Sequence, residues 1–321
     1  MQKVAVLTSG GDAPGMNAAI RAVVRSCIYY NIEVYGILHG YSGIYSGEFR
    51  LLNRFSVADI MQRGGTVLYT ARCDEMLAEG GVERACEILK GNGIDYLVVI
   101  GGDGSYRGAL ALSKCGINVI TLPATIDNDL ACTDYSIGYD TALNTAIEAI
   151  SRIRDTSSSH NRVNVVEVMG RNCGNLALDA ALAGGAEAVA IPEFEYNTAE
   201  ISKRIVSGKQ RGKLHSIVVF AEGAGDIKAF CTDIEKNTQV ETRMTVLGYV
   251  QRGGSPCALD RILAGRMGAL AIELIRKGEK NRAVCYSDGR YTDMDLEDAL
   301  KMKLDKKKQK EILNTALILA V

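Results

Sequence analysis

Residues 96–105 read Tyr-Leu-Val-Val-Ile-Gly-Gly-Asp-Gly-Ser, and this stretch decides the fold class. The short apolar run fits a fully buried strand, and the glycines behind it allow a tight turn. The segment after the turn, residues 104–115, has the apolar period of a helix. A strand that passes through a Gly-rich turn into a helix is typical of a β-α unit in a parallel sheet.

The same alternation of short apolar runs and helical segments continues on both sides of this stretch, which predicts an α/β fold with parallel sheets. The runs expected as strands are residues 4–8, 33–38, 96–100, 118–122, 163–168, 188–191, 216–220 and 244–248. The segments expected as helices lie near residues 16–30, 75–91, 104–115, 139–154, 173–184, 198–208 and 258–277. The lysine-rich stretch 301–310 is expected to be a solvated helix face.

The length and charge of the chain limit its organisation and its partners. With 321 residues, the chain is near the size at which a single core divides, so we expect two domains. No linker marks a boundary, which predicts that the domains are interleaved. The 37 Lys and Arg residues against 38 Asp and Glu residues give a net charge of −1, which argues against nucleic acid and anionic membranes as partners.

Cysteine usage and the N-terminal sequence indicate a cytoplasmic protein. None of the nine cysteines forms a CxxC pair, and the chain has three histidines, so reduced thiols fit better than a transition-metal site. Met1 leads directly into an apolar run without the charged segment of a secretory leader. We expect no membrane span, because no apolar stretch approaches the roughly 18 residues that one needs.

Three loops rich in Gly, Asp and Thr follow predicted strands, where open α/β sheets bind their ligands. The first, residues 8–15 (Thr-Ser-Gly-Gly-Asp-Ala-Pro-Gly), allows a phosphate to approach backbone N–H groups. It lacks GxGxxG, which argues against a dinucleotide-dependent dehydrogenase, and it lacks the lysine of a P-loop. The others are residues 101–105 (Gly-Gly-Asp-Gly-Ser) and 123–129 (Pro-Ala-Thr-Ile-Asp-Asn-Asp).

The carboxylates in these loops predict metal binding and proton transfer. Asp103 would repel phosphate unless Mg²⁺ lay between them, so we expect it to be a metal ligand. For this motif alone, a tight turn with Asp103 as a helix cap is an equal interpretation. Asp127 and Asp129 can divide the work, with Asp127 as the general base and Asp129 holding the water shell of the metal. An Asx-turn with surface carboxylates is the alternative for that loop.

Four arginines in the second half of the chain stand near Gly-rich turns or strand ends: Arg162, Arg171, Arg243 and Arg252. Arginine forks commonly hold phosphate oxygens, although any one of these residues taken alone is more often part of a surface ion pair than of a site. Together with a nucleotide site, they indicate a phosphorylated small-molecule acceptor.

Taken together, residues 8–15, 101–105, 123–129, 168–174 and 250–256 resemble the bacterial ATP-dependent 6-phosphofructokinase family. The resemblance covers essentially the whole chain. It implies a glycolytic kinase that transfers the ATP γ-phosphoryl group to the 1-hydroxyl of fructose 6-phosphate, with Mg²⁺, in a homotetramer. It implies two Rossmann-like domains, with residues 1–138 and 251–301 binding ATP and residues 139–250 and 302–321 binding fructose 6-phosphate.

The resemblance also assigns roles to individual positions. Those matching catalytic residues are Asp127 as the base, with Arg72, Thr125 and Arg171 stabilising the transferring group. Those matching the ATP site are Gly11, Tyr41, Arg72, Cys73, Gly102, Asp103, Gly104 and Ser105, with Asp103 as the Mg²⁺ ligand. Those matching the sugar phosphate site are Thr125, Asp127, Arg162, Met169, Gly170, Arg171, Glu222, Arg243, Tyr249 and Arg252, with Arg162 and Arg243 reaching in from a neighbouring subunit.

An effector site is implied as well, which binds activating ADP or inhibitory phosphoenolpyruvate. Arg21 and Arg25 are four residues apart and share one helix face. The full set of matching positions is Arg21, Arg25, Arg54, Arg154, Gly185, Glu187, Arg211, Lys213 and His215, with Glu187 as a ligand of an effector-bound Mg²⁺. Surface charge explains any single member equally well.

Three positions depart from the family pattern. Tyr249 stands where the family has His, and it cannot become cationic near neutral pH. Ala124 replaces a usual Gly, and Arg211 replaces a usual Lys. Pyrophosphate-dependent relatives, the nearest alternative, carry Asp at the position of Gly104 and Lys at that of Ala124, so the sequence favours ATP.

Two more distant alternatives fit the sequence less well. A lipid or NAD kinase would share Gly-Gly-Asp-Gly but would not need the loops at 123–129 and 251–256. A catalytically silent nucleotide sensor would be expected to lack Asp103, Asp127 or Arg171, and all three are present.

Overall fold

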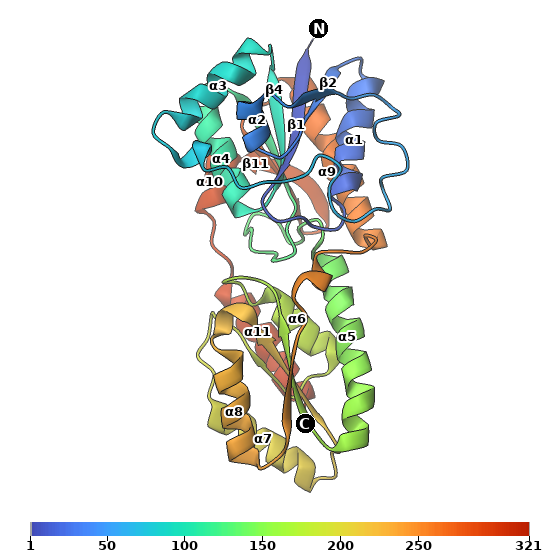
Figure 1. Cartoon of the computed structure of the whole chain (residues 1–321), viewed down its shortest axis with the longest axis vertical. Helices are drawn as coiled ribbons and strands as arrows, with labels where there is room; N and C mark the ends of the chain where they lie inside the picture. The colour runs from blue at the N-terminus through green and yellow to red at the C-terminus, as the bar shows by residue number, and fades with distance from the viewer. Residues whose placement is uncertain (1, 321) are drawn as a thin grey trace. The chain divides into compact units, whose positions relative to one another are not determined.

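The computed structural model describes residues 2–320 and divides the chain into two compact units, each built around its own sheet (Figure 1). Unit 1 contains the chain up to Thr125, Leu130–Thr141 and Arg252–Leu304. Unit 2 contains Ile126–Asp129, Ala142–Gln251 and the chain from Asp305 onward. Each unit is therefore assembled from separate segments of the sequence.

Unit 1 has a seven-stranded sheet in the order β11-β10-β5-β4-β1-β2-β3. The five inner strands are parallel, and the edge strands β3 and β11 are antiparallel to their neighbours. The strands are β1 (Lys3–Ser9), β2 (Glu33–Ile37), β3 (Phe49–Leu51), β4 (Tyr96–Gly101), β5 (Asn118–Pro123), β10 (Arg282–Ser287) and β11 (Arg290–Asp295).

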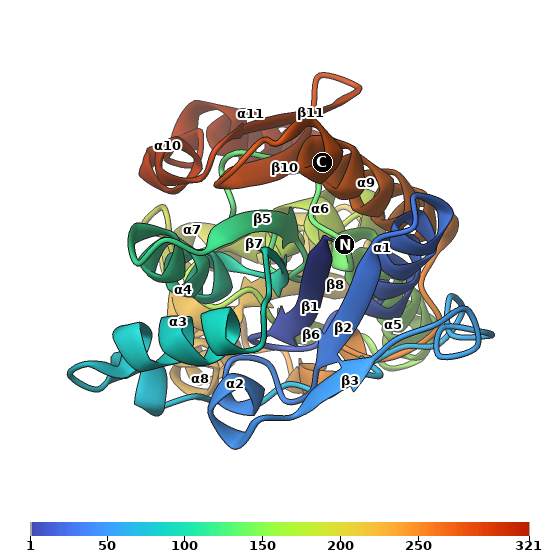
Figure 2. The same ribbon diagram turned by 90° about the horizontal axis from the view of Figure 1, so that it is seen from above.

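Helices cover both faces of this sheet (Figure 2). One face carries α1 (Met16–Tyr29) and α9 (Ala258–Lys277), which pack against each other. The helices of the other face are α2 (Ser42–Ser46), η1 (Glu75–Leu77), α3 (Gly81–Gly91), α4 (Asp103–Lys114) and α10 (Leu296–Lys301).

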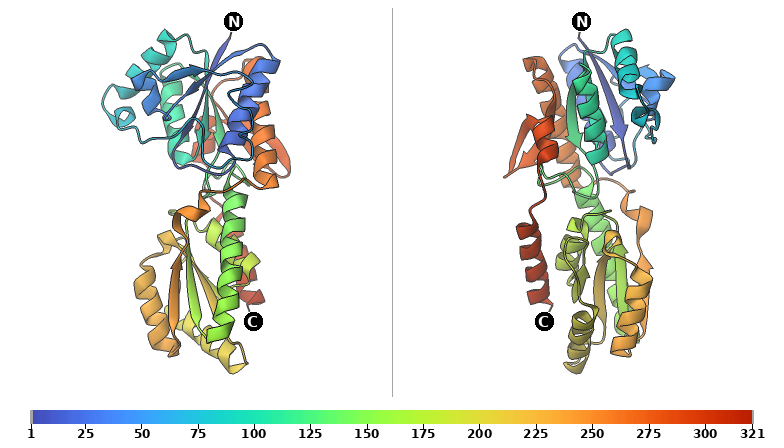
Figure 3. Two further views of the ribbon diagram at one scale, coloured as in Figure 1. Left: turned by 45° about the vertical axis from the view of Figure 1, so that its right-hand side comes forward. Right: turned by 90° about the vertical axis from the view of Figure 1, so that its left-hand side faces the viewer.

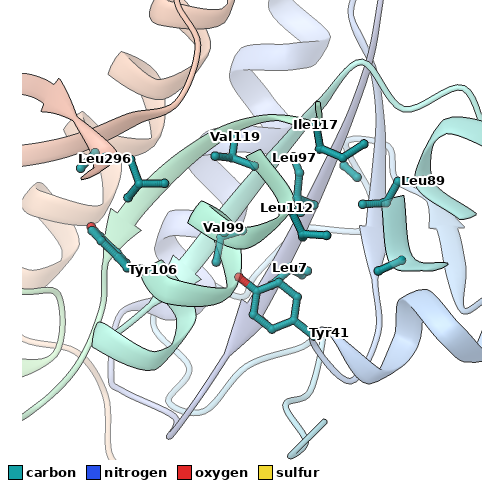
Figure 4. Close-up of a cluster of buried hydrophobic side chains, with 14 of the residues drawn as sticks. Leu7, Tyr41, Leu89, Leu97, Val99, Tyr106, Leu112, Ile117, Val119 and Leu296 are labelled. Atoms are coloured by element: carbon teal, nitrogen blue, oxygen red, sulfur yellow. The ribbon is translucent and has the colours of Figure 1, made fainter. Parts of the chain in front are cut away.

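The core of unit 1 follows from the alternation of side chains along its strands. Leu7, Leu97, Val99 and Val119 belong to the cluster on the α3 and α4 side, where Leu112 of α4 joins them (Figure 4). The residues between them on the strands, such as Val6 and Val98, are equally buried. Because both faces are covered, these strands are apolar throughout.

Unit 2 has a four-stranded parallel sheet in the order β7-β8-β6-β9. Its strands are β6 (Val163–Val168), β7 (Ala188–Ala190), β8 (Ser216–Ala221) and β9 (Thr242–Val246). Its helices are α5 (Tyr139–His160), of which the first turn belongs to unit 1, α6 (Asn175–Gly184), α7 (Thr198–Gln210), α8 (Ile227–Thr238) and α11 (Lys306–Leu319), with the short turns η2 (Glu222–Ala224) and η3 (Gly248–Gln251). Helices α8 and α11 lie on opposite faces of this sheet (Figure 3).

The α/β class and the parallel sheets are confirmed, and every run expected as a strand forms one. The segment 75–91, expected as one helix, breaks at Gly80, whose φ of 72° is left-handed, and forms η1 and α3 instead. The strand expected at 244–248 begins two residues earlier and ends at Val246, and the turn that follows begins at Gly248, whose φ is 55°.

No helix within residues 2–320 has the length and apolar character to cross a membrane.

Candidate active site

Three of the predicted ligand-binding loops leave unit 1 side by side. Ser9 at the end of β1 pairs with Gly101 at the end of β4, and Gly101 pairs with Pro123 at the end of β5. Because the strands are parallel and in register, their following loops start at the same edge of the sheet. This is the position at which α/β sheets bind ligands.

The loop after β4 is shaped by its glycines. A Cβ on Gly101 would lie 2.5 Å from the carbonyl oxygen of Ser9, so a side chain does not fit there. A Cβ on Gly102 would lie 3.3 Å from Cβ of Thr125. Helix α4 begins at Asp103, directly behind this turn. The backbone can therefore bring a helix N-terminus, which attracts anions, close to a ligand.

Ser105 provides a polar group in the first turn of α4. It is 3% exposed, and within residues 2–320 its Oγ has no hydrogen-bond partner. Such a buried hydroxyl is normally satisfied by protein, water or ligand. This donor fits the oxygen atoms of a phosphate.

Three further residues that the resemblance assigns to the ATP site, Tyr41, Arg72 and Cys73, also belong to unit 1. Tyr41 is buried, and its hydroxyl donates to the carbonyl of Ser105 at 2.6 Å, while burial raises the pKa of its phenol well above the ordinary value. Cys73 is half-buried, and desolvation raises the pKa of its thiol. Arg72 is exposed. Tyr41 thus supports the 101–105 loop from behind, while Arg72 faces solvent.

Arg252 lies against the first loop. Its Nη1 donates to the carbonyl of Asp12 at 3.1 Å, and a Cβ on Gly11 would overlap its guanidinium. The structure therefore brings together Gly11, expected at the ATP site, and Arg252, expected at the sugar phosphate site. A cation next to a glycine loop favours an anionic ligand there.

Asp103, the expected metal ligand, lies in the first turn of α4. Within residues 2–320, no group of three or more His, Cys, Asp or Glu side chains is arranged to hold a metal ion. Asp103 instead receives two hydrogen bonds from Arg107, at 2.8 and 3.0 Å. A single carboxylate such as Asp103 fits Mg²⁺, because this ion usually keeps waters and binds through one or two carboxylates plus phosphates.

In unit 2, Asp127 and Arg171 form an ion pair. Asp127 is 3% exposed, and its Oδ2 lies 3.7 Å from Nε of Arg171, whose side chain is 65% exposed. Arg171 has a left-handed φ of 51°, in the turn that follows β6. A buried carboxylate thus stands beside a cation that can reach a ligand from solvent.

Glu222 and Gln251 hold this turn in place. One oxygen of Glu222 accepts from the N–H groups of Gly170 and Arg171 at 3.2 and 2.8 Å. The fully buried Gln251 accepts from the N–H of Met169 at 3.3 Å and donates to the carbonyl of Gly248 at 3.0 Å. Glu222 therefore binds the backbone of Gly170 and Arg171, two positions that are assigned to sugar phosphate binding.

Arg162 and Arg243 are brought together at the neighbouring strands β6 and β9. Nε of Arg162 donates to Glu241 at 2.5 Å, and the guanidinium of Arg243 pairs with the other oxygen of the same carboxylate. These bonds, the one from Arg162 above all, lower the pKa of Glu241 below its usual value. Tyr249, in η3, is 83% exposed. All three expected ligands of the sugar phosphate are thus accessible from solvent.

Unit 2 also gathers most of the expected effector residues. Arg154 donates to the carbonyl of Gly185 at 2.9 Å and lies 3.2 Å from Nε2 of His215. Desolvation, and then the charge of Arg154, lower the pKa of His215. Nζ of Lys213 lies 3.2 Å from Oε1 of Glu187, whose other oxygen accepts from a backbone N–H.

A cavity of about 310 Å³ opens beside these groups. Its lining residues are Glu187, Lys203, Arg204, Ser207, Gly208, Arg211, Lys213 and Ala320. The remaining expected members, Arg21, Arg25 and Arg54, lie in unit 1, where Arg25 donates to the carbonyl of Arg54 at 3.3 Å. The cavity has the size and positive lining of a small-anion site.

Several positioning residues were not predicted from the sequence. Gln251 was part of a recognised motif, but its burial was not evident. Asp260 is fully buried and accepts from the N–H groups of Gly138 and Thr141, both at 2.8 Å, which holds the start of α5. Glu241 and Arg107 look like surface charges in the sequence. Their partners depend on strand pairing and on helix register, which single positions do not reveal.

A glycine-rich loop at a helix N-terminus in unit 1 and a buried carboxylate beside an arginine in unit 2 are features that phosphoryl transfer uses. The model of the family described as phosphofructokinase matches residues 3–275. The chain is 54% identical, over 320 residues and the full length of both proteins, to the ATP-dependent 6-phosphofructokinase of Clostridium botulinum. The chain therefore belongs to the phosphofructokinase family.

Solved structures of this family have the same fold. Phosphofructokinase from Saccharomyces cerevisiae is similar with a TM-score of 0.88 and 33% identity, over 100% of this chain and 48% of that one. A pyrophosphate-dependent phosphofructokinase from Marinobacter aquaeolei is similar with a TM-score of 0.82 and 22% identity, over 99% of this chain and 92% of that one. The fold is thus shared with an enzyme that is pyrophosphate-dependent, so the fold alone does not identify the phosphoryl donor.

Proposed function

We propose that the chain transfers the γ-phosphoryl group of ATP to the 1-hydroxyl of fructose 6-phosphate and releases fructose 1,6-bisphosphate and ADP. The observation that carries this proposal is the buried Asp127 carboxylate beside Arg171, in a chain 54% identical over its full length to an ATP-dependent 6-phosphofructokinase. Unit 1 is the proposed ATP-binding unit, and unit 2 is the proposed sugar phosphate-binding unit. The cytoplasm is the proposed location, which the free thiols favour.

In this proposal, the oxygen of the 1-hydroxyl attacks the γ-phosphorus, and Asp127 accepts the proton that this hydroxyl loses. Arg171, Arg72 and Thr125 face the charge on the transferring group, since phosphoryl transfer depends mainly on positioning and charge neutralisation. The bonds from Gly170 and Arg171 to Glu222 support this assignment, because they fix the turn that carries the arginine.

We further propose that Mg²⁺ is required and that Asp103 helps to hold it. When bound there, Mg²⁺ would neutralise the charge of the phosphates. Asp103 and Ser105 stand in the first turn of α4, where the helix N-terminus adds to the attraction for phosphate. The ion would therefore be held at the 101–105 loop, without a set of several protein ligands around it.

ATP is favoured over pyrophosphate as the donor. A Cβ on Gly104 would meet no atom within 4 Å, so the absent side chain leaves open space beside the loop, and Ala124 is small and buried. Coupled assays with fructose 6-phosphate and Mg²⁺ test this choice: activity is expected with ATP, and pyrophosphate is expected to give little or none. Equal activity with both donors would contradict the proposal.

We also propose a homotetramer in which Arg162 and Arg243 complete the sugar phosphate site of a neighbouring subunit. Strand β9 is an edge strand with partly exposed Met244 and Val246, and exposed Tyr249 and Val250 follow it. Exposed apolar groups along an edge strand favour an interface.

The cationic cavity of unit 2 is the proposed effector site for ADP and phosphoenolpyruvate, and Glu187 is the proposed ligand of an effector-bound Mg²⁺. Both oxygens of Glu187 are already bonded, so the ion would have to replace Lys213. Neutralising Arg25 and Arg211 together is expected to abolish the response to both effectors while kcat at saturating substrate stays nearly constant. An intact response, or an equal loss of kcat, would contradict this assignment.

A further inference from the structure

Arg107 forms hydrogen bonds with the carboxylate of Asp103, which is proposed to bind Mg²⁺. It lies one helical turn after Asp103 on α4, and its Nε and Nη2 donate to Oδ2 and Oδ1 at 2.8 and 3.0 Å. Both oxygens of Asp103 are therefore engaged by one guanidinium. This fork is the most favourable geometry for an arginine and a carboxylate.

The pair is easily broken, because it is exposed. The side chain of Arg107 is 65% exposed and that of Asp103 is 42% exposed. An exposed pair at this spacing shifts an equilibrium by about two-fold. A divalent ion carried by a nucleotide can therefore displace the guanidinium, whereas Asp103 remains oriented while no ion is bound.

The surroundings of the pair indicate that this is a ligand site rather than an ordinary helix-surface pair. Asp103 follows the turn at Gly101 and Gly102, which has no room for side chains. The buried Oγ of Ser105, two residues further on, has no hydrogen-bond partner within residues 2–320. Asp103 and Ser105 thus both lie in the first turn of α4, the end of a helix that attracts anions.

We propose that Arg107 is a positioning residue that holds Asp103 in the metal-free state and is replaced by the Mg²⁺ of an incoming magnesium nucleotide. Arg107 thereby sets the concentration of free Mg²⁺ at which ATP binds. The inference rests on the proposed binding of magnesium ATP at this loop. Its physical basis is competition, because a positive guanidinium and a divalent cation repel each other and need the same oxygens.

The test measures ATP binding by calorimetry across a series of free Mg²⁺ concentrations, without fructose 6-phosphate. In Arg107→Gln, the Mg²⁺ concentration that gives half-maximal ATP affinity is expected to fall about two-fold, the amount by which the exposed pair shifts the equilibrium. ATP affinity at saturating Mg²⁺ is expected to stay unchanged, which a general loss of structure would not allow. Arg107→Lys, which keeps the charge but loses the fork, is expected to lie between the wild type and Arg107→Gln.

A matched control is Arg152→Gln, which breaks another exposed arginine pair at the same spacing, with Glu148 on α5. This variant is expected to leave the Mg²⁺ midpoint unchanged. A midpoint that does not move in Arg107→Gln would overturn the inference. A rise in the midpoint would do the same, because it would make Arg107 a ligand of the nucleotide.

The variant Asp103→Asn tests the proposed metal site separately from the role of Arg107. Loss of the Mg²⁺-dependent part of ATP binding in this variant supports the loop as the site. If the wild type shows no Mg²⁺-dependent binding, or if Asp103→Asn leaves it intact, both the proposed metal site and the role of Arg107 are wrong. An unmoved midpoint in Arg107→Gln alone overturns only the role of Arg107.

Discussion

At the scale of single residues, we propose that the choice of phosphoryl donor depends on the absence of a side chain at position 104. Gly104 lies in the first turn of α4, is exposed, and has open space where a Cβ would stand. An acidic residue there would fit sterically but would place a negative charge at a loop proposed to bind a triphosphate. The donor preference is therefore electrostatic in origin.

We predict that Gly104→Asp raises the KM for ATP about ten-fold, the effect of one like charge at close range in a partly screened site. The KM for fructose 6-phosphate is expected to stay within two-fold, since the change lies in unit 1. Gly104→Ser is the matched control, because it adds a neutral side chain to the same space. Steady-state kinetics with both variants measure this, and an unchanged KM for ATP in Gly104→Asp would argue against nucleotide binding at the loop.

At the scale of helices and strands, the sequence predicted the inner part of each sheet well. Strands such as β4 and β8 are continuous apolar runs because both faces are covered, and this pattern is visible in one dimension. The inner strand β10 was missed, and so were the edge strands β3 and β11, which have no buried residue and include charges. Helix α8 was missed as well, and its start is fixed by an Asp226 cap that resembles any loop aspartate.

The site residues also divide into those that local sequence signals predicted and those that were missed. Asp103 and Asp127 were predicted as site residues because the loops that carry them follow strong strand signals. Glu241 and Asp260 were not predicted, since their roles come from partners far away in the sequence. Side-chain contacts of this kind depend on tertiary packing and leave no local pattern.

Asp260 is predicted to stabilise unit 1 by holding the start of α5. Asp260→Ala leaves the N–H groups of Gly138 and Thr141 without their buried acceptor, so the free energy of unfolding should fall by about 2–4 kcal/mol. Urea unfolding of the variant measures the loss. Asp298→Ala removes an exposed carboxylate on α10 and should change stability by less than about 0.5 kcal/mol. Equal stability of the two variants would contradict the role of Asp260.

At the scale of the whole molecule, the proposed sugar phosphate site is complete only when two subunits contribute to it. Arg162 and Arg243 share the carboxylate of Glu241, and all three side chains are at least partly exposed. They can therefore exchange an internal partner for a phosphate presented by another subunit. Activity should then depend on assembly.

Mixing two inactive variants tests this dependence. Chains with Asp127→Ser and chains with Arg243→Ala are expected to recover part of the wild-type activity when they are unfolded together and reassembled, because some sites then combine two intact halves. Each variant reassembled alone is the control. If mass spectrometry shows mixed oligomers but activity does not return, the shared site is wrong.

The central claim is that Asp127 activates the sugar hydroxyl for attack on ATP. The most direct measurement follows the phosphorus by ³¹P NMR in a mixture of the protein, ATP, Mg²⁺ and fructose 6-phosphate. The wild type should form ADP and fructose 1,6-bisphosphate in equal amounts. Asp127→Ser should lower kcat by about 10²–10⁴, the usual effect of losing a general base, with the affinity for ATP unchanged by calorimetry. Wild-type turnover in Asp127→Ser, or release of inorganic phosphate in place of the bisphosphate by the wild type, would contradict the account.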